Sequence, residues 1–87
     1  MYSRDVTVNN QVGLHARPAT FFIQKANTFE SSVWVEKEER KVNAKSLLGV
    51  LSLGIVQGTS ITVLANGPDE KEAVDGLIEL IESNFSE

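Results

Sequence analysis

The residues best suited to do chemistry lie in the stretch GLHARPA, residues 13–19, which holds the only histidine of the chain, His15. A lone histidine in a loop is more often a surface residue or a helix cap than a chemical group. Directly after it, however, apolar residues take up the i, i+3, i+4, i+7 spacing of one helix face. Those residues are Ala19, Phe22, Ile23 and Ala26. The sequence therefore places His15 at the start of a predicted helix that begins near Ala16, with Pro18 in its first turn.

Three neighbouring features favour a functional histidine at this position. The first N–H groups of the helix lack intrahelical partners and carry about half a positive charge, which suits an anion. Arg17 offers a fork of donors that matches phosphate oxygens. Gly13 allows a backbone conformation that side chains disfavour, so the imidazole ring can be presented to a partner. Together these features predict a phosphoryl-binding site.

The same positive surroundings predict a lowered pKa for His15, below the reference value of about 6.5. The imidazole would then be neutral at pH 7 and able to attack phosphorus, and the positive field would stabilise the phosphoryl group afterwards. A metal site would need further ligands, and the chain has no second histidine and no cysteine. A hydrolase would need a positioned base and an oxyanion hole, for which this short chain offers no obvious cleft.

Composition limits the other classes of function. The 87 residues form one predicted domain, 1–87, with a net charge of −4 and no lysine-rich block, which argues against nucleic-acid binding. No apolar run reaches the length of a signal peptide or of a membrane span. We expect a soluble cytoplasmic protein without metal or cofactor.

The hydropathy pattern predicts the element order βαββαβα. Alternating residues predict strands at Val6 and Val8, at Val33 and Val35, around 41–43, and in SITVLA, residues 60–65. KEER, residues 37–40, reads as a polar turn, and the surrounding EKEER run as solvated. We expect one mostly antiparallel sheet with helices on one face, an α+β fold.

Two further helices follow from cap signals. Ser46 is a predicted N-cap for a short helix over 47–52. Asp69 and Glu72 have the spacing of a capping box at the start of the last helix. The predicted core stripe of that helix contains Ala73, Leu77, Leu80 and Ile81.

Three motifs together resemble the HPr family, the histidine-containing phosphocarriers of the bacterial phosphoenolpyruvate-dependent sugar phosphotransferase system. They are GLHARPA, KSLLGVLSLGI at 45–55 and GPDEKEAV at 67–74. The resemblance covers essentially the whole chain. It implies an open-faced β-sandwich, in which a four-stranded antiparallel sheet carries three helices on one face.

The resemblance also implies roles for residues at the matching positions. His15 would accept a phosphoryl group on Nδ1 from phosphorylated enzyme I and pass it to sugar-specific enzyme IIA domains. Arg17 would clamp the phosphate, and the backbone N–H groups of Ala16 and Arg17 would be further donors. The protein would be a substrate and phosphodonor for other enzymes more than an enzyme itself, and by default a monomer.

Ser46 has a second implied role besides capping. In Gram-positive relatives the matching serine is phosphorylated by an ATP-dependent kinase, and KSLLGVLSLGI resembles that branch more than the enteric one. A phosphate at an N-cap is compatible with the helix dipole. It would repel an acidic partner that contacts Arg17 and Lys45, and it would favour a partner with basic groups, such as a catabolite repressor.

The leucines after Ser46 allow two interpretations. In the first, all of them belong to the core; in the second, Val50 and Leu53 alone satisfy burial. In the second case Leu47, Leu48 and Leu51 stay partly exposed as a docking patch. Three other functions remain open: a regulatory module that acts only through the serine, a carrier in a nitrogen-linked branch of the system, and a generic small-ligand-binding domain.

Overall fold

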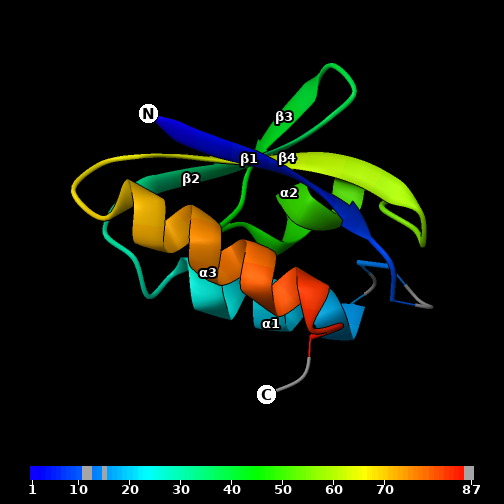
Figure 1. Ribbon diagram of the computed structural model, residues 1–87. Helices are drawn as coiled ribbons and strands as arrows, with labels where there is room; N and C mark the ends of the chain where they lie inside the picture. The colour runs from blue at the N-terminus through cyan, green and yellow to red at the C-terminus, as the bar shows by residue number, and fades with distance from the viewer. Residues whose placement is uncertain (11–12, 15, 86–87) are drawn as a thin grey trace.

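The computed structural model describes residues 1–10, 13–14 and 16–85. Within these residues the chain forms four strands and three helices in the order βαββαβα, as expected from the hydropathy pattern (Figure 1). The elements are β1 (Tyr2–Val8), α1 (Ala16–Ala26), β2 (Ser32–Lys37), β3 (Arg40–Asn43), α2 (Leu47–Ser52), β4 (Thr59–Asn66) and α3 (Glu70–Glu82).

The four strands form one sheet in the order β1-β4-β2-β3, and every neighbouring pair is antiparallel. Val6 on β1 lies opposite Ile61 on β4, and Trp34 on β2 lies opposite Leu64 on β4. The helices cover one face of the sheet and leave the other open (Figure 1). The open-faced sandwich implied by the resemblance is therefore confirmed. Among the described residues, no helix is long and apolar enough to cross a bilayer.

The core lies between the covered face of the sheet and the helices. Alternate strand residues point into it, because side chains along a strand alternate between the two faces of the sheet. The helices add one apolar stripe each. The largest fully buried side chains of the core include Phe22, Val8, Val33, Val35, Val63, Leu77, Ile78 and Ile81. Leu80, expected in the core stripe of α3, is only half-buried at its edge.

Helices α1 and α3 run antiparallel to one another, so the helical layer has two distinct ends (Figure 1). One end holds the first turn of α1 and the last residues of α3; we call it the Arg17 end. The other holds the loop after α1 and the loop that leads into α3; we call it the Asp69 end.

The predicted capping box of α3 is wrong. Asp69 is the N-cap residue, but its side chain makes no cap hydrogen bond, and Glu72 is exposed. The Asp69 carboxylate instead accepts hydrogen bonds from the backbone N–H groups of Glu30 and Ser31, both at 2.9 Å, and from the Ser31 hydroxyl. The Ser31 hydroxyl and then the Glu30 N–H lower the pKa of Asp69. The side chain that was expected to cap a helix therefore ties two loops together.

Candidate functional site

The backbone before α1 is pressed against the segment that follows α2. The Leu14 N–H donates to the Ile55 carbonyl at 2.9 Å. Gly13 has φ +62°, and a Cβ atom there would lie 2.4 Å from the Ile55 oxygen and 2.5 Å from the Val56 Cα. Only glycine fits this position without displacement of the backbone. Gly13 therefore does more than relax the conformation of the loop, because it also allows this close approach.

Two hydrogen bonds between Asn10 and Gly13 also hold the same backbone. The Gly13 N–H donates to the Asn10 carbonyl at 3.2 Å, and the Asn10 side-chain amide donates to the Gly13 carbonyl at 2.7 Å. Asparagine is well suited to tight turns because its side chain bonds to nearby backbone. The approach to position 15 is therefore held by hydrogen bonds in addition to the contact with Ile55 and Val56.

His15, the predicted phosphoryl acceptor, lies outside the described residues. Its described neighbours are Leu14, which is buried, and Ala16, which is exposed and is the first residue of α1. The predictions for the His15 ring and its pKa therefore stay predictions.

The first turn of α1 presents positive charge and hydrogen-bond donors. The backbone N–H groups of Ala16 and Arg17 belong to the first turn, where N–H groups have no intrahelical acceptor, and Pro18 has none to offer. The first turn contains no acidic residue. Arg17 is exposed, and its guanidinium carbon lies 6.0 Å from the centroid of the Phe21 ring. An anion at this turn would meet donors from both the backbone and the side chain.

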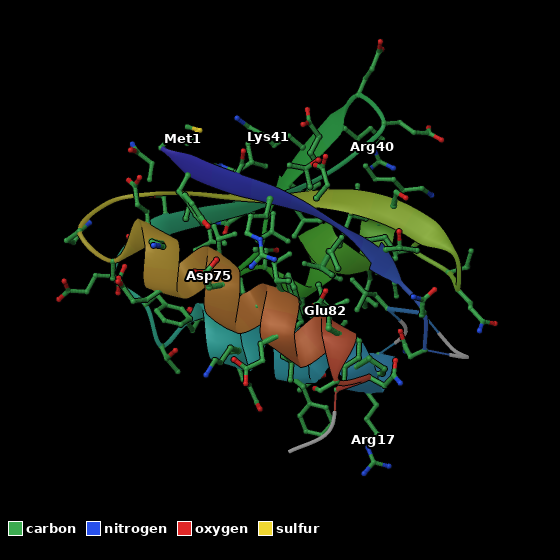
Figure 2. All side chains as sticks on the ribbon, viewed as in Figure 1. Met1, Arg17, Arg40, Lys41, Asp75 and Glu82 are labelled. Carbon is green, nitrogen blue, oxygen red and sulfur yellow. The ribbon has the colours of Figure 1, made fainter. Side chains whose placement is uncertain are left out.

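Arg17 projects away from the ribbon on the side of the helices opposite the sheet (Figure 2). Two ion pairs occur among the described residues, Met1–Glu70 and Arg4–Asp75, and neither involves Arg17. Within residues 1–10, 13–14 and 16–85, no group of three or more acidic or imidazole side chains is arranged to hold a metal ion. The geometry around Arg17 suits an anion.

Residues that follow α3 border the Arg17 side chain, which sequence reasoning did not foresee. A shallow groove of about 530 Å³ is lined by Arg17, Pro18, Phe21 and Phe85, together with three asparagines. Phe85 is buried although its φ is +62°, and its N–H donates to the Leu80 carbonyl at 2.9 Å. Its aromatic type was the only signal for this placement, since nothing local indicates which surface it covers.

Ser46 caps α2, as predicted. Its backbone is extended, with φ −109° and ψ 118°, and its hydroxyl accepts a hydrogen bond from the Gly49 N–H at 3.2 Å. A Cβ atom on Gly49 would lie 3.4 Å from this hydroxyl, so the glycine leaves room for the cap. Ser46 is half-buried, and α2 packs beside α1.

The burial of the α2 leucines agrees with the second of the two interpretations, and their role in docking stays a prediction. Val50 is fully buried and Leu53 is 3% exposed, whereas Leu48 is 80% exposed and is among the most exposed large apolar side chains described. Leu47 and Leu51 are half-buried against the core. We call Leu47, Leu48 and Leu51 the α2 patch.

Lys45 differs from Arg17 in its contacts. Its ammonium donates to the Phe29 carbonyl at 2.8 Å, and the residue is half-buried. Lys45 is thus partly engaged in a hydrogen bond within the protein. Of the two cations predicted to contact a partner, Arg17 is the more accessible.

Comparison with known proteins gives concordant results. A family model described as "PTS HPr component phosphorylation site" matches residues 2–83. The chain is 48% identical over 82 residues to the HPr-like protein Crh of Halalkalibacterium halodurans, covering 94% of this chain and 98% of that protein. It is 42% identical over 87 residues to the phosphocarrier protein HPr of Cupriavidus necator, covering 100% and 98%. The crystal structure of HPr-C-His from Thermoanaerobacter tengcongensis superimposes with a TM-score of 0.97 at 49% identity, covering 100% of this chain and 98% of that one.

Proposed function

Because this chain belongs to the HPr family of the bacterial phosphotransferase system, we propose that it carries a phosphoryl group on His15 between enzyme I and sugar-specific enzyme IIA domains. The observation that supports this most is the first turn of α1. There, exposed Arg17 and the backbone donors of Ala16 and Arg17 directly follow the position of His15 in the chain.

The transfer step needs little from the carrier beyond a neutral nucleophile and a positive field. The lone pair on Nδ1 of His15 forms the new P–N bond while the bond from phosphorus to the donor breaks. The donor keeps that electron pair, and the proton on Nε2 stays in place. Arg17 and the helix N–H groups offset the charge of the phosphoryl oxygens. The carrier must stabilise the group only moderately, since tight binding would slow onward transfer.

Ser46 is the proposed regulatory site, modified by a serine kinase and restored by a phosphorylase. Its cap position supports this proposal, because a phosphate at a helix N-terminus is electrostatically compatible with the helix. The added charge would lie next to the α2 patch and would weaken docking of acidic partners. A Ser46→Asp variant should therefore transfer phosphate more slowly than wild type. Equal rates would count against this role.

The partners we propose follow the same logic. Enzyme I and enzyme IIA domains would contact the exposed charge of Arg17 and the exposed apolar side chains of the α2 patch, above all Leu48. A catabolite repressor would bind the Ser46-phosphorylated form. We propose a monomeric carrier in the cytoplasm; light scattering on the purified protein tests the monomer.

The second candidate is a regulatory module that acts only through Ser46. The 48% identity to an HPr-like protein Crh favours it. The presence of His15 argues for the carrier, because a serine-only module has no need of a nucleophile here.

Intact-mass analysis after incubation with enzyme I, phosphoenolpyruvate and magnesium separates the two candidates. We expect one added phosphate that is lost in mild acid and is absent from a His15→Ala control. If enzyme I phosphorylates another carrier but not this one, the regulatory module is the better account.

A further inference from the structure

Helix α2 is too short to hold its own orientation. It has six residues, and isolated helices of this length are unstable in water. Val50 anchors one side in the core and Ser46 caps the beginning. The position of the exposed leucines also depends on what holds the end of the helix.

Two cations from the β2–β3 hairpin hold that end. Arg40 donates to the Ser52 carbonyl at 2.9 Å and to the Ser52 hydroxyl at 3.2 Å. The Lys37 ammonium donates to the Leu53 carbonyl at 3.0 Å. These carbonyls lie at the negative end of the helix, where positive side chains are favoured. The EKEER run is a solvated turn, as expected, and its two cations at 37 and 40 in addition hold α2.

The sheet register explains why these two residues act together. Lys37 and Arg40 are directly paired across the hairpin, so both side chains leave the same face of the sheet. Lys41, the next residue, leaves the other face and places its ammonium 4.9 Å from the centroid of the Trp34 ring. Figure 2 shows Arg40 and Lys41 on opposite sides of β3.

We propose that Lys37 and Arg40 are positioning residues for the α2 patch. By binding the last carbonyls of α2, the hairpin sets how the leucines are presented to phosphotransfer partners. This inference depends on the proposed function in one respect, namely that the α2 patch docks phosphotransfer partners. The contact itself can be tested without any partner.

The partner-independent test is amide hydrogen exchange by NMR. The Leu53 and Gly54 N–H groups bond to the Val50 and Leu51 carbonyls at the end of α2, both at 3.2 Å. In an Arg40→Ala variant these two amides should exchange about fivefold faster, because the two solvent-exposed hydrogen bonds of Arg40 to Ser52 are lost and together contribute about 1 kcal/mol. Lys41→Ala is the matched control, because it removes the same charge one residue away on the opposite face. Equal exchange in the two variants would overturn the proposal.

The functional test is phosphoryl transfer from the phosphorylated carrier to an enzyme IIA domain. We expect Arg40→Ala to raise the KM for the carrier roughly fivefold with kcat unchanged, since docking and not chemistry is affected. Arg40→Lys should restore part of the affinity, and Lys41→Ala should leave it near wild type. Faster exchange with an unchanged KM would overturn the positioning role. Failure of the wild type to accept phosphate would instead reject the proposed function and leave the exchange result standing.

Discussion

The two ends of the helical layer differ in whether the charged side chain after which each is named is hydrogen-bonded within the protein. At the Asp69 end, the carboxylate of Asp69 accepts hydrogen bonds from Glu30 and Ser31, which lie 39 and 38 positions earlier in the chain. At the Arg17 end, the guanidinium group approaches only the ring of Phe21 among the described contacts. Buried or structural polar groups are normally satisfied within the protein. Charge left available to solvent at the Arg17 end therefore suits binding of an external group.

The backbone at Gly13 and Leu14, next to the Arg17 end, is nevertheless held by close contacts. Gly13 lies against Ile55 and Val56, and Leu14 bonds to Ile55. The two ends thus differ in the hydrogen bonding of their charged side chains and not in how well their backbones are held. A carrier site needs this combination, because a fixed backbone with available donors is prepared to bind phosphate without reorganising.

The largest loss of stability is expected for Gly13→Ala. The alanine must adopt φ +62° and place its Cβ less than 3.0 Å from three backbone atoms, which are the Ile55 oxygen and the Val56 Cα and carbonyl carbon. Left-handed strain and overpacking together should lower the free energy of unfolding by about 3 kcal/mol. Urea denaturation followed by Trp34 fluorescence measures this.

Gly54→Ala is the matched control for that prediction. Gly54 has φ +61°, but a Cβ there meets no atom within 4 Å. Its cost should be only the backbone strain, about 1 kcal/mol. Equal destabilisation of the two variants would show that the close contact of Gly13 with Ile55 and Val56 does not add to the cost of the Gly13→Ala substitution.

The next largest effect is expected at the other end, for Asp69→Ala. The variant leaves the N–H groups of Glu30 and Ser31 without their acceptor, so the melting temperature should fall by roughly 5–10 °C. Ser31→Ala removes the hydroxyl, which donates to the Asp69 carboxylate and accepts from the Asp69 N–H, but it keeps both backbone donors to the carboxylate and should cost less. Phosphate acceptance should be unchanged in both variants. A loss of acceptance in a folded Asp69→Ala protein would argue that the two ends are coupled.

The lowered pKa of the Asp69 carboxylate predicts that the stability of the protein falls in acid. The pKa of Asp69 is lowered below its ordinary value of 3.8 in the folded protein, chiefly by the Ser31 hydroxyl. Its contribution to stability is therefore complete above the unfolded value, near pH 4, and is lost as pH falls through the folded pKa. The stability difference between wild type and Asp69→Asn should shrink over that range in urea titrations.

Part of the acid response should survive in Asp69→Asn. The Gly67 N–H lowers the pKa of Glu70, with a smaller contribution from the N-terminal amine. Glu70 should therefore give the variant a residual loss of stability in the same direction. A stability difference between the two proteins that stays constant down to pH 2 would contradict the role assigned to Asp69.

Local patterns predicted the fold because its determinants are local. Alternation placed Val33 and Val35 inside with Trp34 on the other face, and the cap signal at Ser46 fixed the start of α2. The Asp69 capping box failed for the opposite reason. Its carboxylate has partners in a loop far away in the chain, and a sequence window does not contain them.

The residues of the candidate site also fall into those that local sequence predicts and those that depend on tertiary structure. The donors of the first turn of α1 follow from the helix start, so Ala16 and Arg17 were predictable. The groove wall at Phe85 and the cations that hold α2 were not. They depend on the register of a hairpin and on where the chain end folds back, which are tertiary properties. The role of His15 stays a prediction, since that residue lies outside the described part of the chain.

Leu48→Ala tests the α2 patch as a docking surface at little cost in stability. Leu48 is 80% exposed, so the free energy of unfolding should change by less than about 0.5 kcal/mol. Affinity for enzyme IIA, measured by calorimetry, should fall about tenfold if Leu48 anchors the docking surface. Leu64→Ala, on the open face of the sheet, should leave affinity unchanged. Equal affinities for Leu48→Ala and wild type would remove Leu48 from the docking surface.

The smallest effect on stability is expected for Arg17→Lys, and it addresses the contrast most directly. Arg17 is exposed and its described contact is one ring, so the melting temperature should change by no more than about 1 °C. Lysine keeps the positive charge but loses the planar fork of donors. If the fork positions the phosphoryl oxygens, single-turnover transfer from phosphorylated enzyme I should slow by about tenfold. This is less than the roughly hundredfold effect of losing a donor in a closed site, because Arg17 is exposed to water. Transfer by Arg17→Lys at the wild-type rate, with Arg17→Gln slow, would mean that charge alone suffices. In that case the Arg17 end would act as a positive surface and not as a shaped phosphate clamp.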